Sequence, residues 1–320
     1  MQMAEVVVKI AHQKSYTFKR SFFMDNTPDQ SLVESLLELI RVTSSTLPAD
    51  VKKVIKEAHA REKEGTNAKY AMQIINENIA LAEKNSGPIC QDTGTIIFNV
   101  YHPPGFNQGK FSLAAKQAVM NATSKGYLRQ NSVDSLTGKN SGNNVGPGHP
   151  SLHFHEHEGN SLEVRLMLKG GGCENMGAQY SLPHTELSAD RDIVGVRKVI
   201  LDAVVKAQGK GCGPGILGVA IGGDRGDGYI ESKVQLLRKL DDKNPNPVLD
   251  ELEKDIVVAS NKLAIGPMGF GGETTLLGCK IGVLNRLPAS YFVSVSYMCW
   301  AFRRQGVVLN GASKISKWLY

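Results

Sequence analysis

Three of the five cysteines in this sequence lie in segments that suit metal ligation. Cys90 is followed at once by Gln91 and Asp92, which could orient a substrate or move protons. Cys212 lies between glycines, whose backbone N–H groups can approach the sulfur atoms of a cluster. Cys299 ends an apolar segment. Three separated thiols with no fourth beside them indicate a metal cluster with one open coordination position, although each thiol could instead be a small buried hydrophobe.

The two remaining cysteines are weaker candidates for ligation. Cys279 lies in an apolar segment and is better interpreted as a core residue. Cys173 follows Gly170, Gly171 and Gly172, and its role stays open between the core and the site. The glycines predict either an anion-binding nest of backbone N–H groups or a tight turn. They lack the Lys-Ser/Thr ending of a phosphate-binding P-loop.

Several basic and histidine side chains are further candidates. His153, His155 and His157 alternate, so on a strand they share one face, either as a zinc site or as a solvated surface. Arg129 precedes a segment rich in glycine and asparagine, and two arginines follow Cys299 at positions 303 and 304. Guanidinium groups bind carboxylates as bidentate forks, so these arginines become informative if the substrate is a carboxylate.

The composition of the chain narrows the class of protein. The 320 residues carry a net charge of +6, which favours anionic small molecules or nucleic acid only weakly. No basic run interleaved with aromatic residues supports nucleic-acid binding, and no apolar stretch is long enough to predict a membrane span. The odd number of cysteines and the lack of a signal-peptide pattern predict a reducing, cytoplasmic setting.

The elements that must position these residues follow from hydrophobic periodicity. The fold class we predict is α/β, with a helical N-terminal part followed by mixed α/β layers. One domain over residues 1–320 is expected, within which residues 1–87 can form a helical subdomain. Helices are predicted over residues 29–40, 48 onward, 68–84, 111–125, 190–208, 231–240 and 247–264. Strands are predicted over residues 6–10, 95–100, 151–157, 161–168, 216–221, 279–284 and 291–298.

Together, these segments resemble the α part of the iron–sulfur hydro-lyases, which include class I fumarate hydratases and L-tartrate dehydratases. The resemblance covers most of the chain and depends on the order and spacing of several motifs. These are Cys-Gln-Asp-Thr-Gly at 90–94, Leu-Arg-Gln-Asn at 128–131, Asn-Ser-Gly-Asn-Asn at 140–144, Lys-Gly-Gly-Gly at 169–172, Ile-Gly-Pro-Met-Gly at 265–269 and Cys-Trp-Ala-Phe-Arg-Arg at 299–304.

The resemblance implies a [4Fe–4S] cluster and reversible hydration of fumarate to (S)-malate. The fourth iron would be open to the substrate and act as a Lewis acid. Alternatives are dehydration of L-tartrate or a related dicarboxylate, or a cluster protein without catalysis. The matching positions are Cys90, Cys212 and Cys299 as cluster ligands, Asp92 as a catalytic residue, and Gln91, Arg129 and Gly172 as substrate-binding residues.

The sequence departs from this family at two places that bear on the reaction. Leu287 stands where the family usually has a histidine, twelve residues before the last cluster cysteine. The Lys-Gly-Thr motif that carries the catalytic base in the family is not found in this sequence. The resemblance therefore implies a β subunit or a C-terminal domain that supplies the base, and an oligomeric enzyme.

Overall fold

The computed structural model describes residues 27–320, so the strand predicted at residues 6–10 lies outside the described residues. The first helix, α1 (Gln30–Ser45), begins as predicted because the Asp29 carboxylate accepts hydrogen bonds from the N–H groups of Ser31 and Leu32. Helices α2 (Ala49–Arg61) and α3 (Asn67–Asn85) follow. The helical character predicted for this part of the chain is thus confirmed for residues 30–85, while its status as a separate subdomain stays a prediction.

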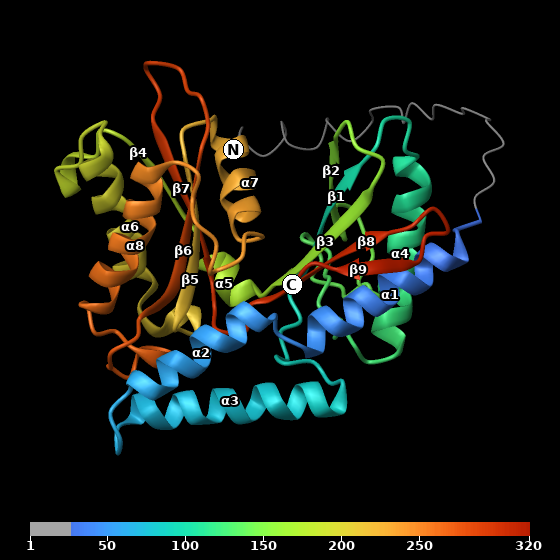
Figure 1. The fold of residues 1–320 in the computed structure, drawn as a ribbon, viewed down its shortest axis with the longest axis horizontal. Helices are drawn as coiled ribbons and strands as arrows, with labels where there is room; N and C mark the ends of the chain where they lie inside the picture. Colours follow the sequence, from blue (N-terminus) through green and yellow to red (C-terminus); the bar gives the residue numbers. More distant parts are fainter. Residues whose placement is uncertain (1–26) are drawn as a thin grey trace, which may run out of the picture.

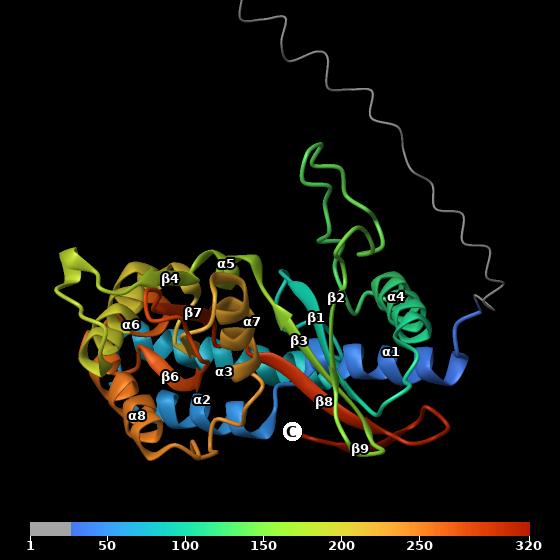
Figure 2. The same cartoon turned by 90° about the horizontal axis from the view of Figure 1, so that it is seen from above.

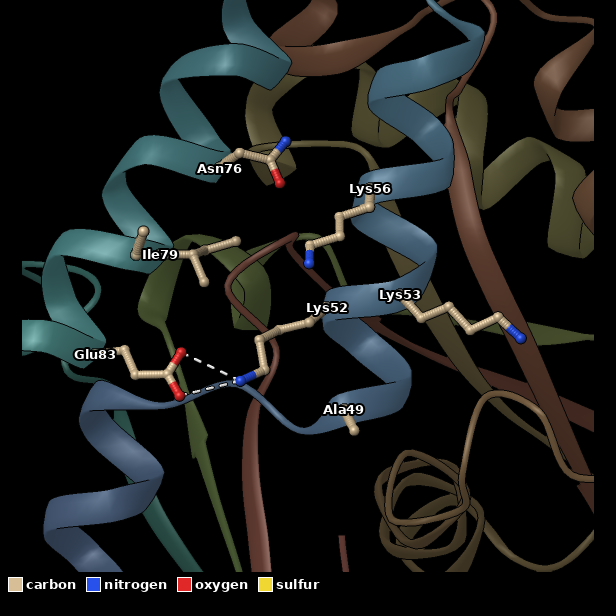
Figure 3. A pocket seen from close by; sticks show the side chains of 8 residues that line it. Ala49, Lys52, Lys53, Lys56, Asn76, Ile79 and Glu83 are labelled. Atoms are coloured by element: carbon tan, nitrogen blue, oxygen red, sulfur yellow. Dashed lines mark hydrogen bonds and ion pairs between the residues drawn. The ribbon is translucent and has the colours of Figure 1, made fainter.

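Helices α2 and α3 pack against each other as a pair beneath the two sheets (Figure 1). Their apolar faces meet around Val51, Ile55 and Ile79, and Lys52 on α2 bonds both carboxylate oxygens of Glu83 on α3 at 3.1 Å. Figure 3 shows this ion pair at the edge of a groove between the helices. None of the predicted ligands or substrate-binding residues lines this groove.

A five-stranded sheet forms one half of the molecule (Figure 1). Helices α1 and α4 (Gln108–Ser124) pack against each other over it, and their apolar residues share one core with those of the strands. The strand order is β2-β1-β3-β8-β9, with β1 at Thr95–His102, β2 at Ser151–Glu156, β3 at Leu162–Lys169, β8 at Arg303–Leu309 and β9 at Ile315–Trp318.

A four-stranded sheet forms the other half, in the order β4-β7-β5-β6. Its strands are β4 (Ala178–Ser181), β5 (Gly215–Ile221), β6 (Leu276–Val283) and β7 (Phe292–Met298). Helices α6 (Ile193–Ala207) and α8 (Pro247–Asn261) share a core with one face. Helix α7 (Arg225–Gln235) packs on the opposite face, so closely that a Cβ at Gly218 would lie 2.1 Å from the carbonyl oxygen of Ser232.

The chain passes directly between the two sheets twice. Residues 170–177 lead from β3 to β4, and residues 299–302 lead from β7 back to β8. A third apolar core lies at this junction and contains Ile97 and Met167 from one sheet and Ile216 and Met298 from the other. Cys173 and Cys299, one in each crossing, also belong to this core. The junction is therefore where residues from distant parts of the sequence meet.

The fold class is α/β, and most of the predicted elements are present. The helix predicted at residues 231–240 runs instead from Arg225 to Gln235, because the Asp224 carboxylate caps it by accepting from the N–H of Asp227 at 2.8 Å. Sequence reasoning did not find β4, β8, β9 or the short helix α5 (Gly171–Asn175). Within residues 27–320, no helix is both long and apolar enough to cross a membrane.

Candidate active site

The loop that carries Cys90 is held against the helical layer before it enters β1. The N–H of Ile89 donates to the carbonyl oxygen of Ser44 at 2.9 Å, and the Ile89 carbonyl accepts from Asn78 at the same distance. The loop then passes the end of β3 at Gly94, which has φ +82°. A Cβ there would lie 2.5 Å from the carbonyl carbon of Lys169, so only glycine permits this approach.

Asp92 connects this loop to both crossings between the sheets. Its carboxylate Oδ2 accepts from the N–H of Gly171 at 2.7 Å, and its backbone carbonyl accepts from Arg303 Nη1 at 2.8 Å. The glycine run at residues 170–172, for which an anion nest and a tight turn were both predicted, begins the short helix α5, and the N–H of Gly171 donates to the carboxylate of Asp92. A Cβ at Gly170 would lie 3.0 Å from Oδ2, which explains the small residue at that position.

Arg129 begins a second loop that lies directly against the first. Its N–H donates to Thr93 Oγ1 at 3.2 Å, and its side chain is exposed. The amide of Asn131 faces the same backbone. When this amide is oriented so that its oxygen faces donors and its nitrogen faces acceptors, the oxygen accepts a hydrogen bond from the N–H of Thr93 at 3.0 Å. The backbone of Arg129 is therefore anchored, and its exposed guanidinium, for which residues 27–320 provide no hydrogen-bond partner, can reach an anion.

Asn144 fixes the shape of this second loop from beneath. Its Oδ1 accepts from the N–H groups of Asn131 at 2.8 Å and Ser132 at 3.1 Å. Its Nδ2 donates to the carbonyl of Arg129 at 2.6 Å and to Thr123 Oγ1 at 3.0 Å. Asn144 is buried and has φ 59°, a conformation that asparagine tolerates better than most residues. Figure 2 shows the segment between α4 and β2 extending away from the rest of the molecule.

Cys212 lies at the same junction, between α6 and β5. It is exposed, has φ 53°, and its carbonyl accepts from the N–H of Trp300 at 3.4 Å. Desolvation raises the pKa of its thiol, and the charges of Cys173, Cys90 and Asp92 add to this effect. The sulfur of Cys212 therefore lies close enough to Cys173 and Cys90 for their charges to affect its pKa.

The glycines beside Cys212 are explained by the ring of Tyr297. A Cβ at Gly211 would lie 2.3 Å from Tyr297 Cε1, and one at Gly215 would lie 2.4 Å from Tyr297 Cζ. The pKa of Tyr297 is raised by burial first and then by the charges of Cys299, Cys173 and Cys212. The Tyr297 ring thus packs against the backbone on both sides of Cys212, and this contact requires glycine at positions 211 and 215.

Cys173 and Cys299 belong to the same apolar core at the junction. The side chain and the backbone of Cys299 lower the pKa of the Cys173 thiol to about 7, although burial acts in the opposite direction. The positive charges of Lys169 and Arg303 act in the same direction. The pKa of Cys299 is raised well above its ordinary value, first by its bond to Cys173 and then by burial.

The residues at this junction fit an iron–sulfur cluster. Cys90, Cys212 and Cys299, the ligands predicted from the sequence, would supply the soft thiolate donors that such clusters prefer. The buried Arg303 has an Nε–H without a hydrogen-bond acceptor among residues 27–320, and the Arg303 charge lowers the pKa of Cys299. Over the same residues, no three His, Cys, Asp or Glu side chains are grouped closely enough to hold a single metal ion.

The other predicted site residues lie at the open side of the junction. Gln91 and Gly172 are both exposed, and no heavy atom would lie within 4 Å of a Cβ at Gly172. Cys279 is buried in β6 within the core of the four-stranded sheet, where burial raises the pKa of its thiol. The prediction that Cys279 is a core residue is confirmed.

The three alternating histidines each have a local partner and do not converge. His153 lies 3.1 Å from Ser151 Oγ, and His155 lies 3.2 Å from Asn99 Oδ1 and stacks on Tyr101. His157 follows the end of β2, and its Nε2 lies 2.9 Å from the carbonyl oxygen of residue 161. This arrangement fits a partly solvated strand face.

Leu287 is exposed on the loop between β6 and β7. The whole length of β7 separates this loop from Cys299, which follows the other end of the strand. Leu287 therefore does not contact the thiols in this chain.

Sequence reasoning gave no role to Asn144 or Lys169, and it named Arg303 only as a possible fork for a substrate carboxylate, whereas Arg303 is buried and bonds the backbone carbonyl of Asp92. The Lys169 ammonium is buried and bonds Glu174 at 2.6 Å. The motifs at 140–144, 169–172 and 299–304 contain all three residues, so the motifs were recognised while these roles were not.

Comparison with known proteins agrees with this geometry. Residues 33–308 match the family model described as fumarate hydratase (Fumerase). A protein of Geobacillus stearothermophilus named "Putative fumarate hydratase class I" is 53% identical over 91% of this chain, which spans 57% of that protein's length. The L(+)-tartrate dehydratase α subunit of Escherichia coli K12 is 30% identical over 90% of this chain and 95% of its own length. The chain belongs to the fumarate hydratase (Fumerase) family.

Proposed function

We propose that this chain is the α part of an iron–sulfur hydro-lyase that interconverts fumarate and (S)-malate. The observation that carries the proposal is that the loops bearing Cys90, Asp92 and Arg129 meet where Cys212 lies, at the junction of the two sheets. The relative at 53% identity is named as a fumarate hydratase, and this chain spans about half of it.

In this proposal Cys90, Cys212 and Cys299 hold a [4Fe–4S] cluster. When bound, the cluster supplies a Lewis-acidic iron that polarises the hydroxyl and carboxylate of the substrate. Arg303 keeps a positive charge beside Cys299, and its buried Nε–H, which has no acceptor among residues 27–320, would be available as a donor to the group that the thiols hold.

The remaining residues bind and orient the dicarboxylate. Arg129 offers a bidentate fork to a carboxylate, and Gln91 and the exposed backbone of Gly172 offer neutral donors. The Asp92 carboxylate is held by Gly171 at one oxygen, which leaves the other to hold or move a proton. These roles are proposals, because they depend on the match between this chain and the family motifs.

A second part of the enzyme is expected to supply the catalytic base. Relatives that this chain covers almost completely are named as α subunits, such as the L(+)-tartrate dehydratase α subunit of Escherichia coli. We infer that a β subunit or a C-terminal domain covers the open side of the junction in an oligomeric enzyme. A cytoplasmic location would keep the five free thiols reduced.

The test is anaerobic cluster reconstitution followed by activity assays with the β part present. We expect conversion of fumarate and malate in both directions, with tartrate a weaker substrate. Absence of both activities in a preparation with full iron and sulfide content would refute the proposal.

Dehydration of L-tartrate is the second candidate, favoured by the relatives at 33% and 30% identity. Arg129 and the thiols serve either substrate, since both are dicarboxylates with a hydroxyl group. A higher kcat/KM for tartrate than for malate would select this candidate. A cluster-binding protein without catalysis would instead load iron and sulfide and convert neither substrate.

A further inference from the structure

A small cavity lies between helix α7 and the edge of the five-stranded sheet formed by β1 and β2. Helix α7 belongs to the other half of the molecule and stands on the side that faces this sheet (Figure 1). The cavity has a volume of about 180 Å³, and none of the predicted cluster ligands or substrate-binding residues lines it. It is therefore separate from the candidate active site.

The two strands give the cavity a polar wall. In the parallel pairing of β1 with β2, Ser151 lies beside Ile97 and His153 lies beside Asn99. These four residues share one face of the sheet, because side chains alternate along a strand, and all four line the cavity. The intervening residues, such as Phe98, point instead into the core beneath α1 and α4. The polar side chains of this edge thus face α7.

Asn99 is the buried member of this wall and is only partly hydrogen-bonded. It is 3% exposed, and its Oδ1 lies 3.2 Å from His155 Nε2. Its Nδ2 has no hydrogen-bond partner among residues 27–320. Buried polar groups are almost always hydrogen-bonded, so this end of the amide is suited to an acceptor that comes from outside the chain.

Helix α7 adds a positive charge to the cavity through Lys233. Glu174 bonds Lys233 and also bonds Lys169 at 2.6 Å, so two ammonium groups share one carboxylate and leave a net positive charge. An ammonium group has three N–H donors, of which Glu174 uses one. The pKa of His153 is lowered by burial and by the charge of Lys233, which keeps the imidazole neutral. Among residues 27–320, no aspartate or glutamate lines the cavity, so it favours an anion.

The remaining lining and the size of the cavity restrict the kind of anion. Ile97 and Ile230 contribute apolar surface beside the polar groups. Pockets for drug-sized molecules have volumes of roughly 300–1,000 Å³, so this cavity admits only a much smaller ligand. Phosphate carries oxygen atoms on every side and would place some of them against the isoleucines. A carboxylate with a short hydrocarbon chain matches both parts of the lining.

We propose that this cavity is a second binding site, which takes a short-chain carboxylate. The carboxylate oxygens accept hydrogen bonds from the Lys233 ammonium and from Asn99 Nδ2, and the hydrocarbon chain packs beside Ile97 and Ile230. Such a site needs no cluster and no β part, so the inference stands independently of the proposed function.

The decisive experiment is a titration of the full chain with butyrate, followed by methyl NMR. The isoleucine δ1 methyl groups are labelled with ¹³C, and Ile97→Val and Ile230→Val assign two of the signals. We expect saturable shifts for Ile97 and Ile230, while Ile96, which points into the core on the opposite face of β1, stays unchanged. Phosphate at the same ionic strength should give no saturable shift. If neither methyl group responds to butyrate, or if phosphate shifts both as strongly, the proposal is wrong.

Three variants locate the binding. Lys233→Met removes the charge and keeps the length of the side chain, so the Kd of butyrate should rise about tenfold or more. Lys53→Met is the matched control, because Lys53 is an exposed lysine of α2 away from the cavity, and its Kd should equal that of the wild type. Arg129→Ala should also bind butyrate as the wild type does.

Two outcomes for these variants would overturn the inference. Equal affinity in Lys233→Met and the wild type would show that the cavity does not hold the carboxylate. Loss of the methyl shifts in Arg129→Ala would place the ligand in the candidate active site instead. Because the wild-type titration needs none of these variants for its result, a folding defect in one of them leaves the main test decisive.

Discussion

Asn144 offers the clearest test of how the fold positions Arg129. It makes four hydrogen bonds and is only 2% exposed, at φ 59°. Each hydrogen bond contributes about 1 kcal/mol to the free energy of unfolding. Water can replace some of the bonds to the loop backbone, so removal of the side chain should lower this free energy by roughly 3 kcal/mol. Alanine carries a further penalty of about 1 kcal/mol in the left-handed region, which glycine does not.

The series Asn144→Gly, Asn144→Ala and Asn143→Ala measures these contributions. Asn143 is the matched control, because its side chain accepts one local bond, from the N–H of Val145 at 3.0 Å. Urea denaturation should show a loss of roughly 3 kcal/mol for Asn144→Gly, about 1 kcal/mol more for Asn144→Ala, and less than 1 kcal/mol for Asn143→Ala.

The same variants test the link to substrate binding. Without the bond to its carbonyl, Arg129 is held only through its N–H to Thr93, and KM should rise about tenfold, which corresponds to roughly 1.4 kcal/mol of lost carboxylate binding. The control should leave KM unchanged. If Asn144→Ala loses less stability than Asn143→Ala, or leaves KM at the wild-type value, the argument that Asn144 positions Arg129 is wrong.

Three further predictions concern other parts of the site and its support. Arg303→Lys keeps the positive charge but loses the guanidinium group, which bonds the carbonyl of Asp92. Iron retention and the reduction potential of the reconstituted protein should both change, while circular dichroism should show an unchanged fold. Burial opposes ionisation of Asp50, but the hydrogen bond and charge of Arg304 outweigh it and lower its pKa. This stability is present above the unfolded pKa and is lost as the pH falls through the folded pKa, so Asp50→Asn should be less stable than wild type at pH 7, and the difference should shrink in acid. The chain assayed without a β part should hydrate no fumarate, and substantial turnover by the isolated chain would contradict the proposed division of the site.

The sequence predicted those elements whose signals are local. Asp29 caps α1 through its own neighbours, and β1, β5 and β7 are short apolar runs bounded by breaks. Helix α7 was misplaced because Gly226 and Gly228 lie within its first turns and reduce its helical pattern. The cap at Asp224 was the signal that could have located its start.

Strand β8 could not be predicted because its first residues are buried and polar. Arg303 bonds the carbonyl of Asp92, and Arg304 forms an ion pair with Asp50 at 2.5 Å. Buried arginines require such partners, and these partners lie more than 200 positions away in the sequence. Local patterns contain no information about contacts of that range. The same reason left the role of Cys173 open, since Cys299 lies in the other crossing.

The junction separates residues that build the site from those that face outward. Arg303, Lys169, Cys299 and Asn144 are buried and fixed by specific contacts. Gln91, Arg129, Gly172 and Cys212, which are the proposed reactive or binding residues, are exposed. Hydration of a double bond requires a site that controls the access of water, because charged groups act far more strongly when bulk solvent is excluded. At this junction, buried residues fix the backbone while the proposed binding residues remain exposed to solvent. Such an arrangement is expected if a second polypeptide part completes the site and excludes solvent.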